Sequence, residues 1–128
     1  MINHFTDLIV WQKSRILFKD IYALMKDSKE YFLRDQILRA TLPISNNIAE
    51  GFGRYSKKEY TQFLNISRGS VYEVESMLFI LLDISSIDKN KLEELQKLIS
   101  DIKNLLNALI QSVLRKIESE DISKRKSK

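Results

Sequence analysis

Residues 43–69 read PISNNIAEGFGRYSKKEYTQFLNISRG, and this stretch contains the only proline of the 128-residue chain and all three of its glycines. Proline and glycine mark places where a backbone bends or where another group approaches it closely. The sequence on either side of the stretch contains neither residue. This distribution favours long, uninterrupted helices on both sides.

Apolar residues repeat at alternating intervals of three and four in four segments, which is the spacing of amphipathic helices. The segments cover residues 8–26, 30–54, 57–85 and the chain after Asp88. The predicted core positions are Val10, Ser14, Leu17, Ile21, Leu24, Leu33, Ile37, Ala40, Ile44, Ile48, Tyr60, Leu64, Ser67, Val71, Val74, Leu78, Leu81, Leu92, Leu95, Ile99, Ile102, Leu106, Leu109 and Val113. Short connections between such long helices force antiparallel neighbours, so we predict an all-α, antiparallel up-down-up-down four-helix bundle over residues 1–118.

The junction between the second and third segments carries local signals of its own. A glycine in the left-handed conformation is expected to end the second helix near residues 51–54. Ser56-Lys57-Lys58-Glu59 fits the S-x-x-E capping box that begins a helix. Gly69 falls inside the third helix, where glycine costs about 1 kcal/mol relative to alanine. We therefore expect a close helix contact at Gly69.

The last ten residues, SEDISKRKSK (119–128), lose the helical spacing and are rich in lysine and arginine. We expect a disordered basic tail. Its basic residues either bind phosphates or serve only as a solvated end of the chain.

Composition limits the classes of function. The chain has no cysteine, which excludes disulfides and thiolate metal sites. No apolar run reaches the roughly 18 residues of a membrane span, and the first residues lack the features of a signal peptide. We therefore expect a cytoplasmic protein with no membrane partner. The formal charge of +4 and the pI of about 9.3 direct attention to basic surfaces.

Patterns typical of catalysis or metal binding are missing from the sequence. The only histidine, His4, precedes the first helix, and no P-loop or G-x-G-x-x-G motif occurs. The Glu-x-x-His pairs of di-metal bundles are also missing. We expect no enzymatic activity, no metal and no cofactor.

Polar side chains on the second and third segments form one candidate constellation. Its members are Arg39, Asn47, Glu50, Arg54, Arg68 and Glu73. We interpret them as a structural polar network that fixes helix register, with a ligand site as the alternative. Arg54 follows Glu50 by four residues, a spacing that allows an ion pair on one helix face.

Basic residues with aromatic neighbours form a second candidate constellation, which we interpret as a nucleic-acid-binding surface. Arg54, Lys57 and Lys58 surround the junction between the second and third helices. The other members lie at intervals of three and four on the first helix and are Trp11, Arg15, Lys19, Tyr22 and Lys26. In the alternative interpretation, the two aromatic residues are buried at a protein interface.

The sequence resembles a family of four-helix bundle proteins encoded by intervening sequences inside bacterial large-subunit ribosomal RNA genes. FTDLIVWQKS (residues 5–14) resembles the opening of that family, and DQILRATLPISNNIAEGFGRYSKKEYTQFLNISRGSVYEVES (residues 35–76) resembles its central signature. The resemblance spans roughly residues 5–115, and its most distinctive elements lie in residues 47–54 and 63–70. This sequence has Ser67 where alanine is common in the family.

The resemblance implies a left-handed four-helix bundle that assembles as a homopentamer. A related group, the accessory variability determinant of diversity-generating retroelements, is a basic pentameric bundle that binds nucleic acid and a reverse transcriptase. Enzymatic activity is not implied. Assembly agrees with apolar residues outside the predicted core, which are Leu8, Trp11, Phe18, Tyr22, Met25, Leu98, Leu105, Ile110 and Leu114.

These observations lead to two functional hypotheses. In the first, the chain is a non-catalytic oligomeric bundle that binds structured RNA or DNA through phosphate-directed basic residues. In the second, it is a scaffold that recruits a protein partner such as a reverse transcriptase, and its basic charge serves for electrostatic steering.

Overall fold

The computed structural model describes residues 1–127. In this range the chain forms a short 3-10 helix, η1 (Phe5–Asp7), and four α-helices, namely α1 (Ile9–Met25), α2 (Tyr31–Phe52), α3 (Lys57–Asp83) and α4 (Lys89–Ser127). No strand occurs among the described residues. The predicted all-α class and the four helices are confirmed.

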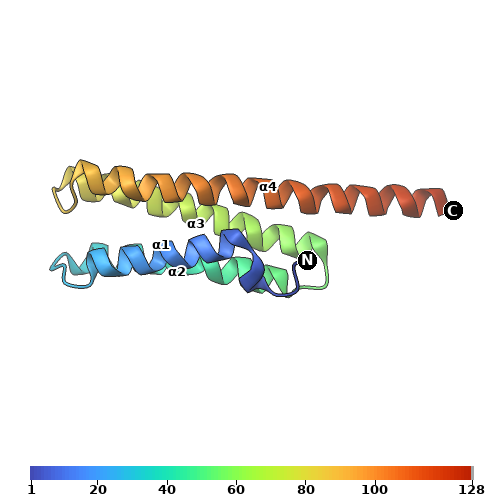
Figure 1. Ribbon diagram of the computed structural model, residues 1–128, viewed down its shortest axis with the longest axis horizontal. Helices are drawn as coiled ribbons and strands as arrows, with labels where there is room; N and C mark the ends of the chain where they lie inside the picture. Colours follow the sequence, from blue (N-terminus) through green and yellow to red (C-terminus); the bar gives the residue numbers. More distant parts are fainter. Residues whose placement is uncertain (128) are drawn as a thin grey trace.

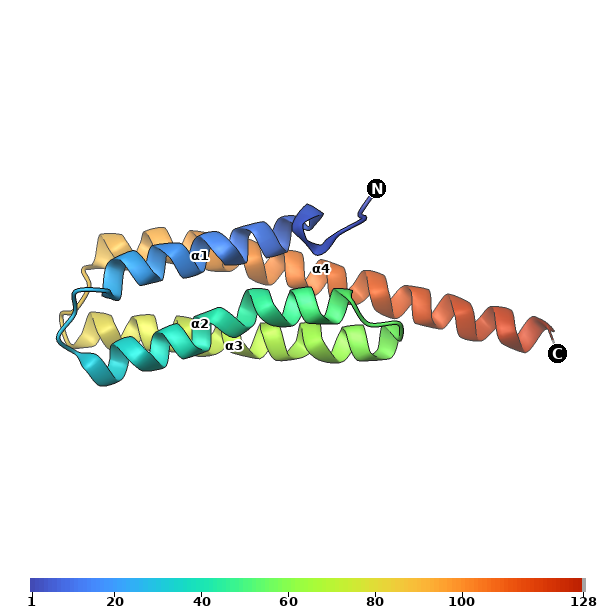
Figure 2. The same cartoon turned by 90° about the horizontal axis from the view of Figure 1, so that it is seen from below.

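The four helices lie side by side as a bundle, and the chain reverses at each connection (Figures 1 and 2). α1 packs against α2 and α4, and α3 packs against the same two helices. α1 and α3 therefore lie on diagonal corners. We call the end with the α1–α2 and α3–α4 connections the loop end. The opposite end, with the α2–α3 turn and the N-terminus, is the turn end.

A continuous apolar cluster drawn from all four helices forms the core. The predicted core positions are buried or partly buried, with a shift of one residue in two places. Met25 rather than Leu24 is fully buried at the end of α1, and Ile110 rather than Leu109 is buried in α4. An α-helix has 3.6 residues per turn rather than 3.5, so a seam read at strict three-and-four spacing drifts along a long helix. Ile110, expected outside the core, belongs to it.

α2 and α3 approach each other closely near the turn end. A Cβ atom on Gly51 would lie 2.8 Å from the Cβ of Phe63 and 3.0 Å from the ring of Tyr60. Farther along the pair, the buried hydroxyl of Ser67 donates a hydrogen bond of 2.8 Å to the carbonyl of Ile44. Glycine is therefore required at position 51 because the neighbouring helix is close.

The prediction that a glycine in the left-handed conformation ends α2 is wrong. No described glycine has a positive φ, and Gly53 closes α2 with a φ of −79°. The left-handed residue instead follows α3, where Ser85 has a φ of 61°. The expectation for Gly69 is also wrong within the chain, because Gly69 is exposed and a Cβ atom there would meet nothing within 4 Å.

The beginning of α3 follows the sequence signal. Ser56 is the N-cap residue, and its hydroxyl accepts a hydrogen bond of 3.3 Å from the backbone N–H of Glu59. This is the serine half of the predicted capping box. At the loop end, the Asp88 carboxylate accepts a 2.8 Å bond from the N–H of Lys91 and begins α4 in the same way.

α4 continues well past the rest of the bundle (Figure 1). It has 39 residues against 27 in α3, which at 1.5 Å per residue makes it longer by about 18 Å. The tail was expected to be disordered, but residues 119–127 continue the helix. Three basic residues in the last turn interact favourably with the carboxyl end of the helix dipole. Lys128 lies outside the described residues, and the division at residue 118 stays a prediction.

We call residues 114–127 the α4 extension. Val113 is the last buried residue of α4 and Ile117 is partly buried. The other side chains of the extension through Lys126 are exposed. None of the helices within residues 1–127 is long and apolar enough to cross a membrane.

Candidate nucleic-acid interface

The basic cluster predicted at the α2–α3 turn lies at the turn end, where the first turn of α3 presents its lysines. Arg54 forms an ion pair of 2.9 Å with Glu50, as its i,i+4 spacing allowed, and its guanidinium lies 4.9 Å from the centre of the Phe63 ring. Lys57 is paired with Glu120 of the α4 extension. Lys58 is exposed and forms no ion pair with another residue of the described chain. The three basic residues therefore differ in how strongly contacts with neighbouring side chains fix their positions.

The two aromatic residues of the basic stripe predicted on α1 differ in their exposure to solvent. Trp11 is partly buried against the core, and its ring contacts Phe5 at 5.1 Å and the Arg15 guanidinium at 5.6 Å. Tyr22 is exposed and stacks on Phe18 with ring centres 6.3 Å apart. The tryptophan therefore has a structural contact in the monomer, while Tyr22 keeps an exposed ring.

The remaining lysines of the stripe separate along the helix. Lys19 lies beside Arg15 on the exposed surface of α1. Lys26 follows the last residue of α1 at the loop end, opposite to the α2–α3 turn. The six predicted contact residues therefore do not form one patch.

Charge is distributed unequally between the two ends of the bundle. At the turn end, residues 50–59 and 114–127 contain eight basic and five acidic residues. At the loop end, residues 26–35 and 83–94 contain five basic and seven acidic residues. The turn end is thus the end whose field attracts a polyanion.

The residues predicted as a polar network are not joined into one. Arg39 and Glu73 are exposed, and neither forms an ion pair within residues 1–127. Asn47 donates to the carbonyl of Pro43 at 2.8 Å, within its own helix. Arg68 bonds Asn65 of α3 and Asn107 of α4 at 3.0 Å each. The pair between Glu50 and Arg54 is the only link among the predicted members in the described chain.

Comparison with known proteins identifies the chain's relatives. The sequence model of the 23S rRNA-intervening sequence protein family matches residues 6–108. The chain belongs to the 23S rRNA-intervening sequence protein family. A crystal structure of a protein of unknown function from the S23 ribosomal protein family of Bacteroides thetaiotaomicron VPI-5482 is similar, with 28% identity and a TM-score of 0.77. The similarity covers 80% of this chain and 96% of that chain. No curated protein matches the sequence.

The family match stops before the α4 extension begins. The α2–α3 turn with Lys57 and Lys58 lies inside the matched region, whereas Glu120 and the basic residues Lys124, Arg125 and Lys126 lie outside it. The ion pair between Lys57 and Glu120 therefore joins a residue inside the matched region to a residue outside it.

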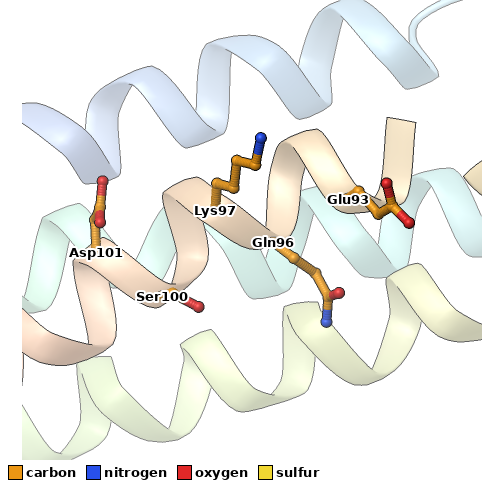
Figure 3. Close-up of a pocket in the computed structure, with 5 residues that line it drawn as sticks. All are labelled: Glu93, Gln96, Lys97, Ser100 and Asp101. Carbon is orange, nitrogen blue, oxygen red and sulfur yellow. The ribbon is translucent and has the colours of Figure 1, made fainter. Parts of the chain in front are cut away.

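The surface depressions of this member of the 23S rRNA-intervening sequence family are shallow features of its helices, as one of them on α4 shows. This depression is lined by Glu93, Gln96, Lys97, Ser100 and Asp101, all from α4. Figure 3 shows Gln96 pointing toward α3 and Asp101 toward α1. Asp101 is paired with Lys13 at 2.9 Å. A depression built along one helix does not enclose a substrate, and the described residues hold no cluster of metal-binding side chains.

Sequence reasoning missed the charged contacts that join separate helices. Glu75 of α3 pairs with Lys103 of α4 at 2.7 Å, and each side chain is only 20% exposed. Lys103 also lies 4.4 Å from the centre of the Tyr72 ring. The pair between Lys57 and Glu120 joins residues 63 positions apart. No local spacing signals such pairs, because they depend on which helices are neighbours.

Proposed function

We propose that this family member is a non-catalytic oligomeric bundle that binds structured RNA at its turn end. The binding surface consists of Arg54, Lys57 and Lys58, joined by the basic residues of the α4 extension. Arg15 and Lys19 on α1 add a second, flanking contact. Lys26 lies at the loop end and makes no contact with the same RNA segment.

The concentration of positive charge at the turn end carries this proposal. Lysine and arginine that neutralise phosphates give affinity with little discrimination between sequences. Lys58 and the lysine and arginine side chains of the α4 extension are exposed, so their cations are accessible to a phosphate backbone. The name of the family, which refers to intervening sequences in 23S rRNA, supports ribosomal RNA as the first ligand to examine.

A matched pair of lysine variants tests the proposal. Lys58→Ala removes an exposed cation at the turn end, and Lys29→Ala removes one at the loop end. We expect Lys58→Ala to weaken binding of labelled 23S rRNA fragments and to lower the slope of log K against log salt by about one, with Lys29→Ala unchanged. Absence of binding at 50 mM salt, or equal effects of the two variants, would reject the turn end as the RNA site.

The oligomeric part of the proposal rests on two exposed apolar faces. α1 exposes Ile9 and Ile16, while α3 exposes Ile66, Tyr72 and Phe79, of which Ile66 and Tyr72 are 54% and 53% exposed. α1 and α3 occupy diagonal corners, so these different faces point away from each other. Two different faces on opposite sides suit head-to-tail contacts that close into a ring.

Exposed Gly69 supports the same arrangement. It lies in the middle of α3, between Ile66 and Tyr72, and a Cβ atom there would have no atom of another described element within 4 Å. A partner helix could therefore pack closely against α3 there. The homopentamer and the left-handed sense of the bundle, both implied by the family resemblance, belong to this proposal.

Solution mass tests the assembly. We expect light scattering to report five times the 15.0 kDa of one chain. Ile66→Glu places a charge on the proposed α3 face and should dissociate the assembly, whereas Leu42→Glu on the exposed side of α2 should not. A wild-type mass of one chain would refute the ring.

A protein scaffold is the second candidate function, and the loop end favours it. Phe32, at the beginning of α2, is 75% exposed beside the exposed ring of Tyr31. Exposed aromatic side chains are enriched at protein interfaces. A protein partner captured after nuclease treatment by the wild type, and lost with Phe32→Ser but retained with Lys58→Ala, would support this function over RNA binding.

A further inference from the structure

The α4 extension contacts the proposed RNA site through one ion pair. The Nζ atom of Lys57, in the first turn of α3, is paired with a carboxylate oxygen of Glu120. A cleft between the two elements is lined by residues of the turn and of the extension, namely Tyr55, Ser56, Lys57, Lys58, Ile117, Glu120, Asp121 and Lys124. The Glu120 carboxylate of the extension thus forms an ion pair with the Lys57 ammonium of the turn.

The electrostatic environment of Glu120 agrees with this contact. The hydrogen bond from Lys57 is the main cause that lowers the pKa of Glu120, and the positive charges of Lys57 and Lys124 act in the same direction. Glu120 is therefore an anion at neutral pH and an acceptor for the Lys57 ammonium. Carboxylate and phosphate oxygens accept the same type of charge-assisted hydrogen bond from lysine.

The contact is weak enough to open. The side chains of Lys57 and Glu120 are 38% and 53% exposed, so water and salt compete for both. The two other basic residues of the turn differ from Lys57, because Arg54 pairs with Glu50 of α2 and Lys58 forms no ion pair with any residue that the structure describes. Among these three cations, only Lys57 is neutralised by the extension.

We propose that Glu120 is an internal competitor for RNA phosphate at Lys57, so that the α4 extension restrains the affinity of the turn end. This inference rests on the proposed RNA-binding function and adds a regulatory contact to the same site. When RNA binds, a phosphate replaces the Glu120 carboxylate at Lys57. The basic residues Lys124, Arg125 and Lys126, which are already exposed, contact the same RNA.

A pair of charge-neutralising variants tests the competitor. Glu120→Gln removes the carboxylate that holds Lys57. Glu118→Gln removes the same charge two residues earlier, where the side chain lines a different face of α4 with Leu114 and Arg125. We expect Glu120→Gln to tighten binding of a 23S rRNA fragment about two- to five-fold at 0.15 M salt, because a surface ion pair corresponds to an effect of that size. Glu118→Gln should change binding by less than about 1.5-fold, because distant charges are screened at this salt concentration.

A double variant assigns the gain to Lys57. If Glu120 acts by occupying that lysine, Glu120→Gln in a Lys57→Ala background should no longer tighten binding. Circular dichroism of each variant checks that the helices are intact. If Glu120→Gln still tightens RNA binding to the full extent in the Lys57→Ala background, Glu120 does not act through Lys57 and the proposal is wrong.

The remaining outcomes separate this inference from the function on which it rests. If the wild type binds RNA and the two single glutamate variants bind alike, the competitor is refuted and RNA binding stands. If neither the wild type nor Glu120→Gln binds RNA at 50 mM salt, the proposed function is refuted, and the competitor is refuted with it.

Discussion

The two ends of the bundle close the helices by different physical means. At the turn end, α2 and α3 are joined by residues 53–56 and pack closely because Gly51 has no side chain. At the loop end, the α3–α4 connection turns through the left-handed Ser85, and Ile87 anchors it in the core. The turn end carries excess positive charge and the loop end excess negative charge. The two ends of this bundle therefore differ both in how their helices are connected and in the sign of their excess charge.

The largest expected effect tests the close packing at the turn end. Gly51→Ala would place a methyl group 2.8 Å from the Cβ of Phe63, and we expect a loss of about 2 kcal/mol in the free energy of unfolding. Gly53→Ala is the control, because its φ suits any residue and the nearest atom would be 3.6 Å away. Urea denaturation measures both. Equal stability of the two variants would mean that α2 and α3 are not this close.

The next effect concerns Tyr60, which packs beside Gly51 and the ring of Phe52. Burial raises the pKa of Tyr60 to about 12. As pH rises above 10, the unfolded chain loses the phenol proton while the folded chain keeps it, so stability is full below pH 10 and falls until about pH 12. We expect a loss of about 1 kcal/mol, discounted because the ring is only partly buried.

Chemical denaturation at pH 9 and pH 11.5 measures this loss. The control is Tyr60→Phe, in which the part of the alkaline loss that comes from this phenol should disappear. An identical pH dependence in the wild type and Tyr60→Phe would show that the phenol is as accessible in the folded chain as in the unfolded chain.

A smaller effect tests the loop end. Ser85 adopts a left-handed conformation that glycine adopts without steric cost, and the N–H of Ser86 donates to the carbonyl of Leu81 at 2.8 Å. We expect Ser85→Gly to raise the free energy of unfolding by about 0.5 to 1 kcal/mol. Ser86→Gly should lower it slightly, because glycine adds freedom to the unfolded chain without relieving a strained φ. Thermal melts of the two variants measure the difference in stability. A lower melting temperature for Ser85→Gly than for Ser86→Gly would contradict the prediction.

The smallest expected effect sharpens the distinction between the bundle and the α4 extension. Ending the chain at Glu118 removes exposed turns of helix, so we expect the free energy of unfolding to change by less than about 0.5 kcal/mol. Guanidinium denaturation of the shortened and full-length chains measures the difference. A loss above about 1 kcal/mol would mean that the extension stabilises the bundle rather than only contacting its turn.

Much of the architecture was predictable because it depends on local chemistry. Helical spacing identified the four helices, and Ser56 marked the beginning of α3. The i,i+4 spacing of Glu50 and Arg54 allowed their ion pair. The candidate cations were also identifiable, but their grouping was not, because Lys26 and Lys57 lie at opposite ends once the helices fold back.

The sequence by itself determined the number of helices, the identity of most core residues and the excess of basic charge, since each follows from side-chain type and spacing along one chain segment. The tertiary structure alone decided which glycine is required by close packing, and that Glu120 holds Lys57 across 63 positions. It also decided that positive charge gathers at one end. These properties depend on distances between separate helices, and side-chain spacing within any one helix does not contain that information.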